Sequence, residues 1–364
     1  MEMTKEQVII KDHKIKDMLI QVMIDNEWSD IYITSWTYPA IKIWGSIMKI
    51  DEWIEPFTPK DTQEFAESII TPSQKESLLK LKNLDFSFSH MNRRFRWNIS
   101  FQQWSYMVIL RLLSAKIPSI EHLNLPPVYE NVCKKWQWLI LVTWPTWSWK
   151  STTLASMLDF INANYNKHII TIEDPVEYIH QHKKSIVEHK EIGRDVPDYE
   201  TALKWAMRQT PDVILFWEMR TREEIETALT LAETGHLVFS TLHTRSASQT
   251  ISRIIDAFPE WQQNQIRLQL ADTMVWVFSQ RLLKTNDWTW VRMTKEILVS
   301  NHAVANVIRE NEIHQLPSLM QMGSKEWMQL LEKDVIDLIK TWFISEEEWL
   351  KYANNPKLIK EALI

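Results

Sequence analysis

Glycine is the residue type that this sequence most conspicuously lacks. The chain has 364 residues and only 4 glycines, whereas glycine usually makes up about 7% of a soluble chain. It has 20 tryptophans, and the two types together make 24 residues, close to the usual share of glycine alone. A phosphate-binding loop needs glycines, because its backbone adopts φ > 0 and approaches the phosphates closely. As written, the sequence therefore excludes such a loop.

Cysteine is nearly absent as well, since Cys133 is the only one. One cysteine excludes an internal disulfide and a four-cysteine zinc site, and we expect a buried, inert thiol in a reducing compartment. A net charge of -6 argues against nonspecific binding to nucleic acid. The amino terminus is charged, and no apolar run approaches the ~20 residues of a membrane span. These features predict a cytoplasmic protein without direct nucleic-acid contact.

The length allows two domains, and the pattern predicts an α/β fold. Residues 1–115 combine helical segments with alternating strands such as DIYIT and RFRWNISF. Residues 116–135 are predicted to be a linker, because Pro126 and Pro127 are adjacent. Over 136–300, short apolar strands alternate with amphipathic helices, which is typical of a parallel sheet with crossover helices. Residues 301–364 are helical in pattern.

Residues 139–153 read LILVTWPTWSWKSTT. With glycine in place of Trp144, Trp147 and Trp149, residues 144–151 become GPTGSGKS, a complete phosphate loop between a strand and a helix. The predicted nucleotide site comprises Trp144, Pro145, Thr146, Trp147, Ser148, Trp149, Lys150, Ser151 and Thr152. Lys150 is expected to reach the β- and γ-phosphates of ATP, and Ser151 to ligate Mg2+.

Other tryptophans also stand where glycine is expected. Trp288 and Trp290 lie in a predicted turn, and Trp342 follows a predicted helix end, where a cap favours glycine. Tryptophans that served as core filler would instead follow the apolar periodicity. Our hypothesis is that most of these tryptophans are glycines in the source organism, encoded by a reassigned UGA codon.

Polar side chains follow three predicted strands, where ligands bind in open α/β sheets. TIEDPVEYIH carries Glu173, Asp174 and Glu177, DVILFWEMR carries Glu218, and STLHT carries His243. Each is a weak signal alone, because acids at strand ends are often solvated and a single histidine is often a structural hydrogen-bonding group. Their order behind a phosphate loop makes the pattern specific.

These segments resemble the Walker A, Asp-box, Walker B and His-box motifs of the secretion ATPases that drive type II secretion and type IV pili. Within that group the chain resembles the retraction ATPases, including AVANVIRENEIHQLPSLMQMG near the end. The family segments carry glycine at many tryptophan positions, namely 36, 138, 144, 147, 149, 217, 288, 327 and 342.

The resemblance implies a homo-hexameric ring, in which a PAS-like amino-terminal domain and a RecA-like carboxy-terminal domain clamp ATP with Mg2+. It implies a position at the cytoplasmic face of the inner membrane, through a pilus platform protein. The catalytic carboxylate is expected to be Glu177, the Walker B acid and metal partner Glu218, and the nucleotide reporter His243. Candidate arginine fingers are Arg94, Arg96 and Arg111, for which the alternative is a solvated strand face.

The chain departs from the family pattern at Thr210, Thr221 and Ser240, where relatives usually carry an acid, an acid and a glycine. Two other functions remain open. An assembly or secretion ATPase commonly carries a tetracysteine zinc module, which Cys133 alone cannot form. A nonhydrolysing ring scaffold is expected if the phosphate-loop tryptophans are real, because three indoles would block phosphate binding.

Overall fold

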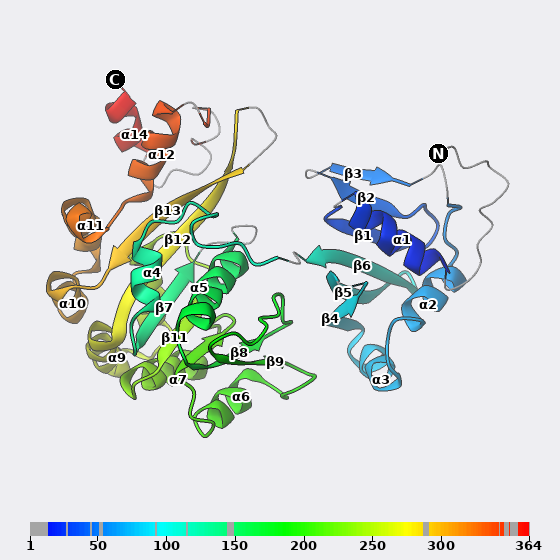
Figure 1. The fold of residues 1–364 in the computed structure, drawn as a ribbon, viewed down its shortest axis with the longest axis horizontal. Coiled ribbons are helices and arrows are strands. Elements are labelled where there is room, and N and C mark those ends of the chain that lie inside the picture. The colour runs from blue at the N-terminus through cyan, green and yellow to red at the C-terminus, as the bar shows by residue number, and fades with distance from the viewer. Residues whose placement is uncertain are drawn as a thin grey trace. The chain divides into compact units, whose positions relative to one another are not determined.

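A computed structural model describes residues 14–26, 28–43, 46–50, 54–91, 93–113, 116–143, 149–286, 291–341, 343–345, 349 and 356–363. The chain forms two compact units. The amino-terminal domain comprises Met1–Lys116 and the short segment Asp174–Tyr178, and the carboxy-terminal domain comprises Ile117–Glu173 and Ile179–Ile364. The fold is mixed α/β in both domains (Figure 1), which confirms the predicted fold class.

The amino-terminal domain is a PAS-like α/β domain built on a six-stranded antiparallel sheet, with the strand order β3-β2-β1-β6-β5-β4. Its elements are α1 (Lys14–Asp25), β1 (Asp30–Thr34), β2 (Ala40–Ile43), β3 (Ser46–Lys49), α2 (Pro59–Glu67), α3 (Pro72–Leu81), β4 (Asn83–His90), β5 (Arg93–Gln102) and β6 (Ser105–Leu113). Helices α2 and α3 begin with capping boxes at Thr58 and Thr71, each followed by a proline that suits the first helical turn.

Strand β5 alternates strictly between two environments, as a strand with one face on the core must. Phe95, Trp97 and Ile99 are fully buried, whereas Arg94 and Arg96 are half-buried on the other face. The alternation therefore places both arginines away from the hydrophobic core.

The turn between β5 and β6 consists of Gln103 and Trp104, whose φ angles are 43° and 64°. A two-residue hairpin loop with both φ angles positive is a type I′ turn, which favours glycine at its second position. Trp104 is entirely solvent-exposed, at 102% of its reference area. Packing thus contributes nothing to hold tryptophan here, and the backbone conformation is one that glycine adopts most easily.

The carboxy-terminal domain is a RecA-like fold with a seven-stranded sheet in the order β13-β12-β7-β11-β10-β8-β9 (Figure 1). All neighbouring strands are parallel except β13, which pairs antiparallel with β12. The strands are β7 (Trp138–Thr143), β8 (His168–Glu173), β9 (Ile186–Glu191), β10 (Val213–Phe216), β11 (Leu237–Leu242), β12 (Met274–Lys284) and β13 (Val291–Val299).

Helices precede or separate most of the strands, except that β8 is followed directly by β9 and β12 by β13, and the helices after β13 follow one another. They are α4 (Val128–Cys133), α5 (Lys150–Asn164), α6 (Tyr199–Ala206), α7 (Arg222–Glu233), α8 (Ala247–Asp256), α9 (Glu260–Thr273), α10 (His302–Arg309), α11 (Leu316–Met322), α12 (Leu331–Lys340) and α14 (Pro356–Leu363). Two short 3-10 helices, η2 (Ile313–Gln315) and η3 (Gly323–Glu326), flank α11.

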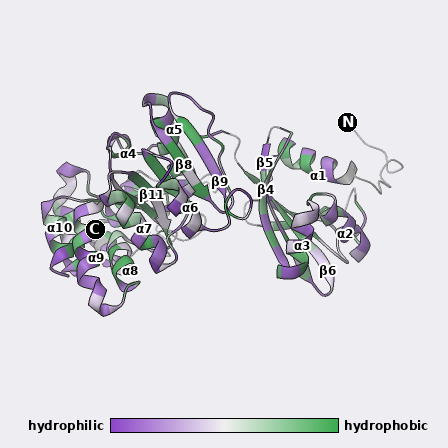
Figure 2. Cartoon of the chain, turned by 90° about the horizontal axis from the view of Figure 1, so that it is seen from below, coloured by the Kyte–Doolittle hydropathy of each residue, from purple (hydrophilic) through white to green (hydrophobic). Residues whose placement is uncertain are grey.

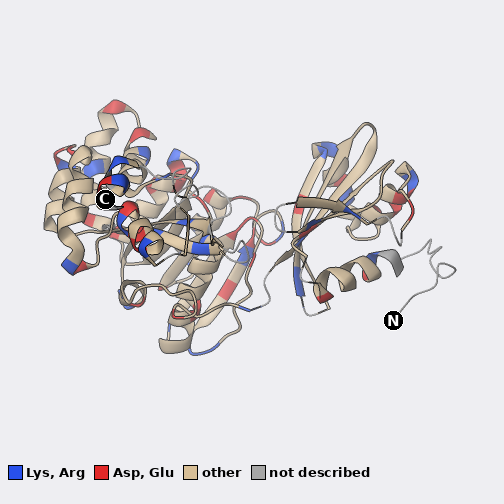
Figure 3. Cartoon of the chain, turned by 90° about the horizontal axis from the view of Figure 1, so that it is seen from above, with Lys and Arg blue, Asp and Glu red and all other residues tan. Residues whose placement is uncertain are grey.

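Burial explains why the central strands read as continuous apolar runs. Every residue of β10 and β11 is buried, as expected for parallel strands covered on both faces. Figure 2 shows green strands in the interior of this domain, whereas α8 and α9 alternate purple and green. In Figure 3, segments coloured for acidic residues (red) and basic residues (blue) are interspersed along the helices. No helix described here is long and apolar enough to cross a membrane.

The stretch predicted to be a linker, residues 116–135, is only partly irregular, because it contains α4. Pro127 occupies the N-cap of this helix, and a proline at a helix start leaves the following hydrogen bonds intact. Tyr129 is fully buried and stacks on Phe278, with ring centroids 4.0 Å apart. Cys133 is also buried, and burial raises the pKa of its thiol. The predicted burial of Cys133 is thus confirmed, and the stretch predicted to be a linker contains a helix.

Replacing Trp104 with glycine should stabilise the amino-terminal domain relative to Trp104→Ala by about 1 kcal/mol, because alanine keeps the cost of the positive φ. Trp104→Ala itself should stay close to the parent, since the indole is fully exposed. Urea unfolding of the full chain, followed at the transition of this domain, measures both values. Equal stability of the two variants would contradict the conformational argument.

Candidate nucleotide-binding and hydrolysis site

The predicted phosphate loop leads from β7 into α5, and its residues 144–148 lie outside the described residues. The structure describes the last part of the motif. Trp149 is the N-cap of α5 and has φ 57° and ψ 27°, the left-handed conformation. Its side chain is 41% exposed. A bulky residue pays a conformational cost in this region that glycine does not, so the backbone at this position is suited to glycine.

Positive φ angles recur at other tryptophans. Besides Trp149, the residues concerned are Trp36, Trp104, Trp138 and Trp327. The φ of 130° at Trp138 lies far outside the regions that bulky residues adopt. Trp217 shows no positive φ, so the backbone there makes no such demand, and Trp144, Trp147, Trp288, Trp290 and Trp342 lie outside the described residues.

Three predicted site residues come together at the carboxyl ends of β7, β10 and β11. Lys150 Nζ lies 3.2 Å from His243 Nδ1. The other ring nitrogen, Nε2, lies 3.1 Å from Glu218 Oε1. A lysine ammonium has no acceptor, so His243 Nδ1 must accept from Lys150 and its Nε2–H must donate to Glu218. The contacts therefore define a neutral imidazole with its proton on Nε2.

The electrostatics agree with that tautomer. Burial, followed by the positive charge of Lys150, lowers the pKa of His243 below its usual value, and Arg220 acts in the same direction. Glu218 opposes the shift without reversing it. Lys150 itself is 7% exposed at the first residue of α5.

Glu218 occupies a strained position. Its φ is 68°, uncommon for a residue with a side chain and found mostly where the surroundings hold it. Here the backbone on both sides is tied to neighbouring strands: Trp217 N–H donates to Ile172 O at 2.9 Å, and Met219 N–H donates to Thr241 O at 3.1 Å. The two adjacent strands thus fix the carboxylate at the sheet edge.

Two of the family departures have local roles in this structure. Thr221 is the N-cap of α7 and forms a capping box with Glu224. Ser240 donates to Phe216 O at 2.9 Å and joins β11 to β10. Thr210 has φ 50° in the turn before β10, and the structure shows no further consequence of the missing acid.

Glu177 and the three candidate arginine fingers belong to the amino-terminal domain. Arg94 Nε donates to Val176 O at 2.8 Å, so it holds the backbone of the Asp174–Tyr178 segment that carries Glu177. Arg96 forms an ion pair with Asp85, at 2.6 Å between Nη2 and Oδ2. This pair raises the pKa of Arg96, to which the charges of Glu177 and Asp174 also contribute.

Arg111 has a different environment. Its Nε lies 2.7 Å from Oδ1 of Asp30, and the Asp30 side chain is completely buried. Burying a carboxylate without a partner is energetically costly. Arg111 therefore stabilises the fold by pairing with Asp30. The register places Arg96 directly opposite Arg111, and each guanidinium has its own acidic partner.

Ser151 and Thr152 follow Lys150 in the first turn of α5 and are half-buried. Within the described ranges, no group of three or more His, Cys, Asp or Glu side chains is placed to hold a metal ion.

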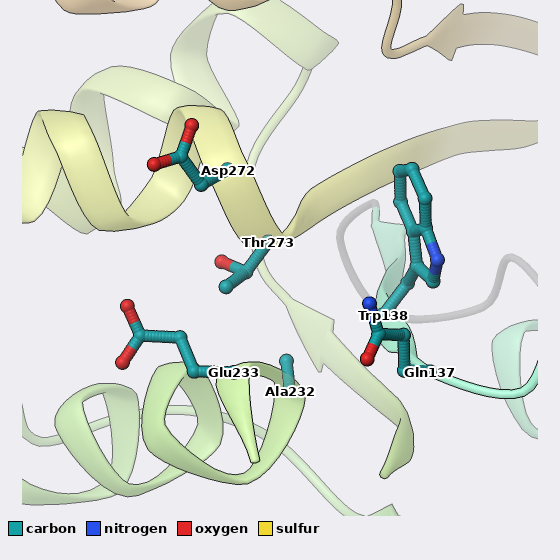
Figure 4. A pocket seen from close by; sticks show the side chains of 6 residues that line it. All are labelled: Gln137, Trp138, Ala232, Glu233, Asp272 and Thr273. Atoms are coloured by element: carbon teal, nitrogen blue, oxygen red, sulfur yellow. The ribbon is translucent and has the colours of Figure 1, made fainter. Parts of the chain in front are cut away.

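A pocket of about 160 Å³ lies elsewhere in this domain (Figure 4). Its lining residues are Gln137, Trp138, Ala232, Glu233, Asp272 and Thr273. Trp138 is the first residue of β7, whereas Lys150 follows the carboxyl end of that strand. The pocket is thus at the opposite edge of the sheet from Lys150, Glu218 and His243.

Sequence reasoning missed Arg220, which contacts Glu218 with both its Nε, at 2.8 Å, and its Nη2, at 2.7 Å. The only sequence signal was its place two residues after the Walker B acid. The resulting arrangement has a lysine after β7 at the start of α5, an acid after β10, and a histidine after β11, the strand between those two. That arrangement is suited to binding phosphates and to sensing them.

The chain belongs to the family described as type II/IV secretion system protein, whose sequence profile matches residues 80–337. The fold and the strand-end residues thus define a member of the secretion ATPase class.

Among individual proteins, the chain is similar to the type IV pilus retraction ATPase PilT of Pseudomonas aeruginosa, with 37% identity over 90% of this chain and 95% of that protein. It is 36% identical to the twitching motility protein of Neisseria gonorrhoeae, over 90% of this chain and 87% of that protein. Its fold matches a crystal structure of the pilus retraction motor PilT with bound ADP, with a TM-score of 0.87 and 41% identity over 94% of this chain and 98% of that one.

The pKa of His243 should be below its ordinary value of about 6.5, so the ring is neutral at pH 7 and gains its proton only as the pH falls further. Removing the ammonium with Lys150→Ala should move the pKa of His243 upward. Histidine ring resonances, assigned with His243→Asn and followed by NMR during a pH titration, measure both values. A His243 pKa of 6.5 or above in the parent chain would contradict the proposed tautomer.

Proposed function

We propose that this protein is an ATP-hydrolysing motor that powers retraction of type IV pili, and hence twitching motility. One observation supports ATP hydrolysis. Lys150 contacts His243, and His243 contacts Glu218, at the carboxyl ends of the parallel strands. Retraction is supported by the similarity to PilT and to the twitching motility protein, which extends over nine-tenths of the chain.

The residues have the following proposed roles. Lys150 and the backbone at the start of α5 bind the β- and γ-phosphates of ATP. Glu177 activates the attacking water, and His243 reports the state of the nucleotide to Glu218. Arg94 and Arg96 neutralise charge on the γ-phosphate, whereas the contact of Arg111 with buried Asp30 supports its structural alternative.

Mg2+ is part of the proposal, and the donor set fits it. The Ser151 hydroxyl and the Glu218 carboxylate are oxygen donors, which Mg2+ prefers. Each Glu218 oxygen already has a protein partner, Arg220 or His243. This arrangement suits a contact through water, since Mg2+ retains several water ligands. When bound, the ion neutralises charge on the phosphates.

We also propose that the protein works as a homo-hexamer at the cytoplasmic face of the inner membrane, against a pilus platform protein. Pilus assembly or type II secretion is the second candidate function. Single Cys133 cannot form the zinc module common in those relatives, which favours retraction.

The native protein, we further propose, carries glycine at the phosphate-loop positions 144, 147 and 149, and at 36, 104, 138 and 327. The positive φ angles at positions 36, 104, 138, 149 and 327 support this assignment. The chain with glycine at all seven positions is called the glycine form below.

The glycine form should bind ATP and hydrolyse it in the presence of Mg2+, whereas the chain as written should bind ATP poorly, because indoles occupy the space that the phosphates need. Fluorescence anisotropy with a labelled ATP measures binding, and phosphate release measures hydrolysis. Equally tight binding by both forms would refute the steric argument. A matched control is Glu177→Gln in the glycine form, which should keep ATP binding and lose hydrolysis by about 100-fold or more.

The direction of the motor is tested in the organism that carries the gene. Deleting the gene should leave surface pili in place, or increase them, while abolishing their retraction under the microscope. Cells that lose their surface pili would instead identify an assembly ATPase.

A further inference from the structure

Arg220 makes a contact that no predicted role requires. Its Nε lies 2.8 Å and its Nη2 2.7 Å from Oε2 of Glu218. The other oxygen of Glu218, Oε1, faces Nε2 of His243 at 3.1 Å. The carboxylate is therefore held from both sides, by a guanidinium on one oxygen and an imidazole on the other.

The exposure of the two partners shows what this contact can do. The Arg220 side chain is 58% exposed, whereas that of Glu218 is 14% exposed. An ion pair with one exposed partner contributes little to folding, typically ~0–1 kcal/mol. Yet it fixes the orientation of a nearly buried carboxylate, and a guanidinium with two N–H groups directed at one oxygen restricts that orientation more than a single ammonium can.

The backbone reinforces the arrangement. Arg220 N–H donates to Glu224 Oε2 at 2.7 Å, the carboxylate that also completes the capping box of α7. The position of Arg220 is thus set by the start of a helix, while Glu218 is set by strained backbone between two strands. The guanidinium connects these two rigid parts.

We propose that Arg220 is a positioning residue for the ATPase reaction: it orients Glu218 so that this carboxylate accepts a hydrogen bond from His243 Nε2–H, which leaves His243 Nδ1 directed at Lys150. The effect on catalysis rests on the proposed function. The orientation of Glu218 and the tautomer of His243 concern only the contacts among Lys150, His243, Glu218 and Arg220.

Arg220→Gln and Arg220→Lys in the glycine form test the orienting contact. Arg220→Gln should lower kcat roughly 10-fold, the range seen when a partner that orients a ligating carboxylate is lost, while the KM for ATP stays near the parent value, because Arg220 acts through Glu218. Arg220→Lys keeps the charge and a donor for Glu218, so kcat should fall by a smaller factor. Arg253→Gln, which removes the same charge from an exposed position on α8, should match the parent.

A purely structural surface pair predicts a different result. If Arg220→Gln has the parent kcat, the proposal is overturned while the ATPase function stands. If the glycine form does not hydrolyse ATP at all, the proposed function fails, and the tautomer of His243, measured from its ring nitrogen resonances by NMR at a fixed alkaline pH, still tests the positioning role. Loss of the Nε2–H tautomer in Arg220→Gln but not in Arg253→Gln supports that role, and an unchanged tautomer refutes it. Thermal unfolding checks that all variants remain folded.

Discussion

The backbone that joins β7 to α5 must turn through a left-handed conformation immediately before Lys150, and the proposed site depends on that turn. At position 149 the structure shows this conformation with a tryptophan in it, although glycine is the residue that adopts it without strain. The same conflict recurs at position 104, in a hairpin turn, and at position 138, at the start of β7. Tryptophan accounts for five of the positive-φ positions among the described residues, more than any other non-glycine type. For these five positions, a single cause at the level of the genetic code is a simpler explanation than several local ones.

The parallel sheet brings residues that are distant in the sequence together at one site. Lys150, Glu218 and His243 lie far apart in the chain, but they follow β7, β10 and β11, whose carboxyl ends meet at one edge. There, a neutral imidazole joins a lysine to a carboxylate. The charge or position of any one of these groups affects the others, because the region is partly buried and its dielectric constant is lower than that of water. Such coupling is what a motor needs to convert a change at the phosphates into a change in the protein.

Much of this arrangement could be predicted from the sequence, for identifiable reasons. Continuous apolar runs predicted the parallel strands, and the acidic and histidine residues directly after them predicted Glu218 and His243. Helix α4 was missed because Pro126 and Pro127 suggested a break, although proline is tolerated at a helix start. The partners of Arg111 and Arg220 were missed for another reason. The first depends on the register between β1 and β6, and the second on a side chain that turns back along its own loop, and neither leaves a periodic signal.

The central claim is that the native phosphate loop contains glycine and can therefore hold a nucleotide. It is tested most directly by mass spectrometry of the protein isolated from its own cells, on the tryptic peptide that follows Lys135 and ends at Lys150. We predict glycine at positions 144, 147 and 149 of that peptide. Tryptophan at all three positions would contradict the account, since the loop could not approach a phosphate, and a ring scaffold without hydrolysis would then be the better interpretation.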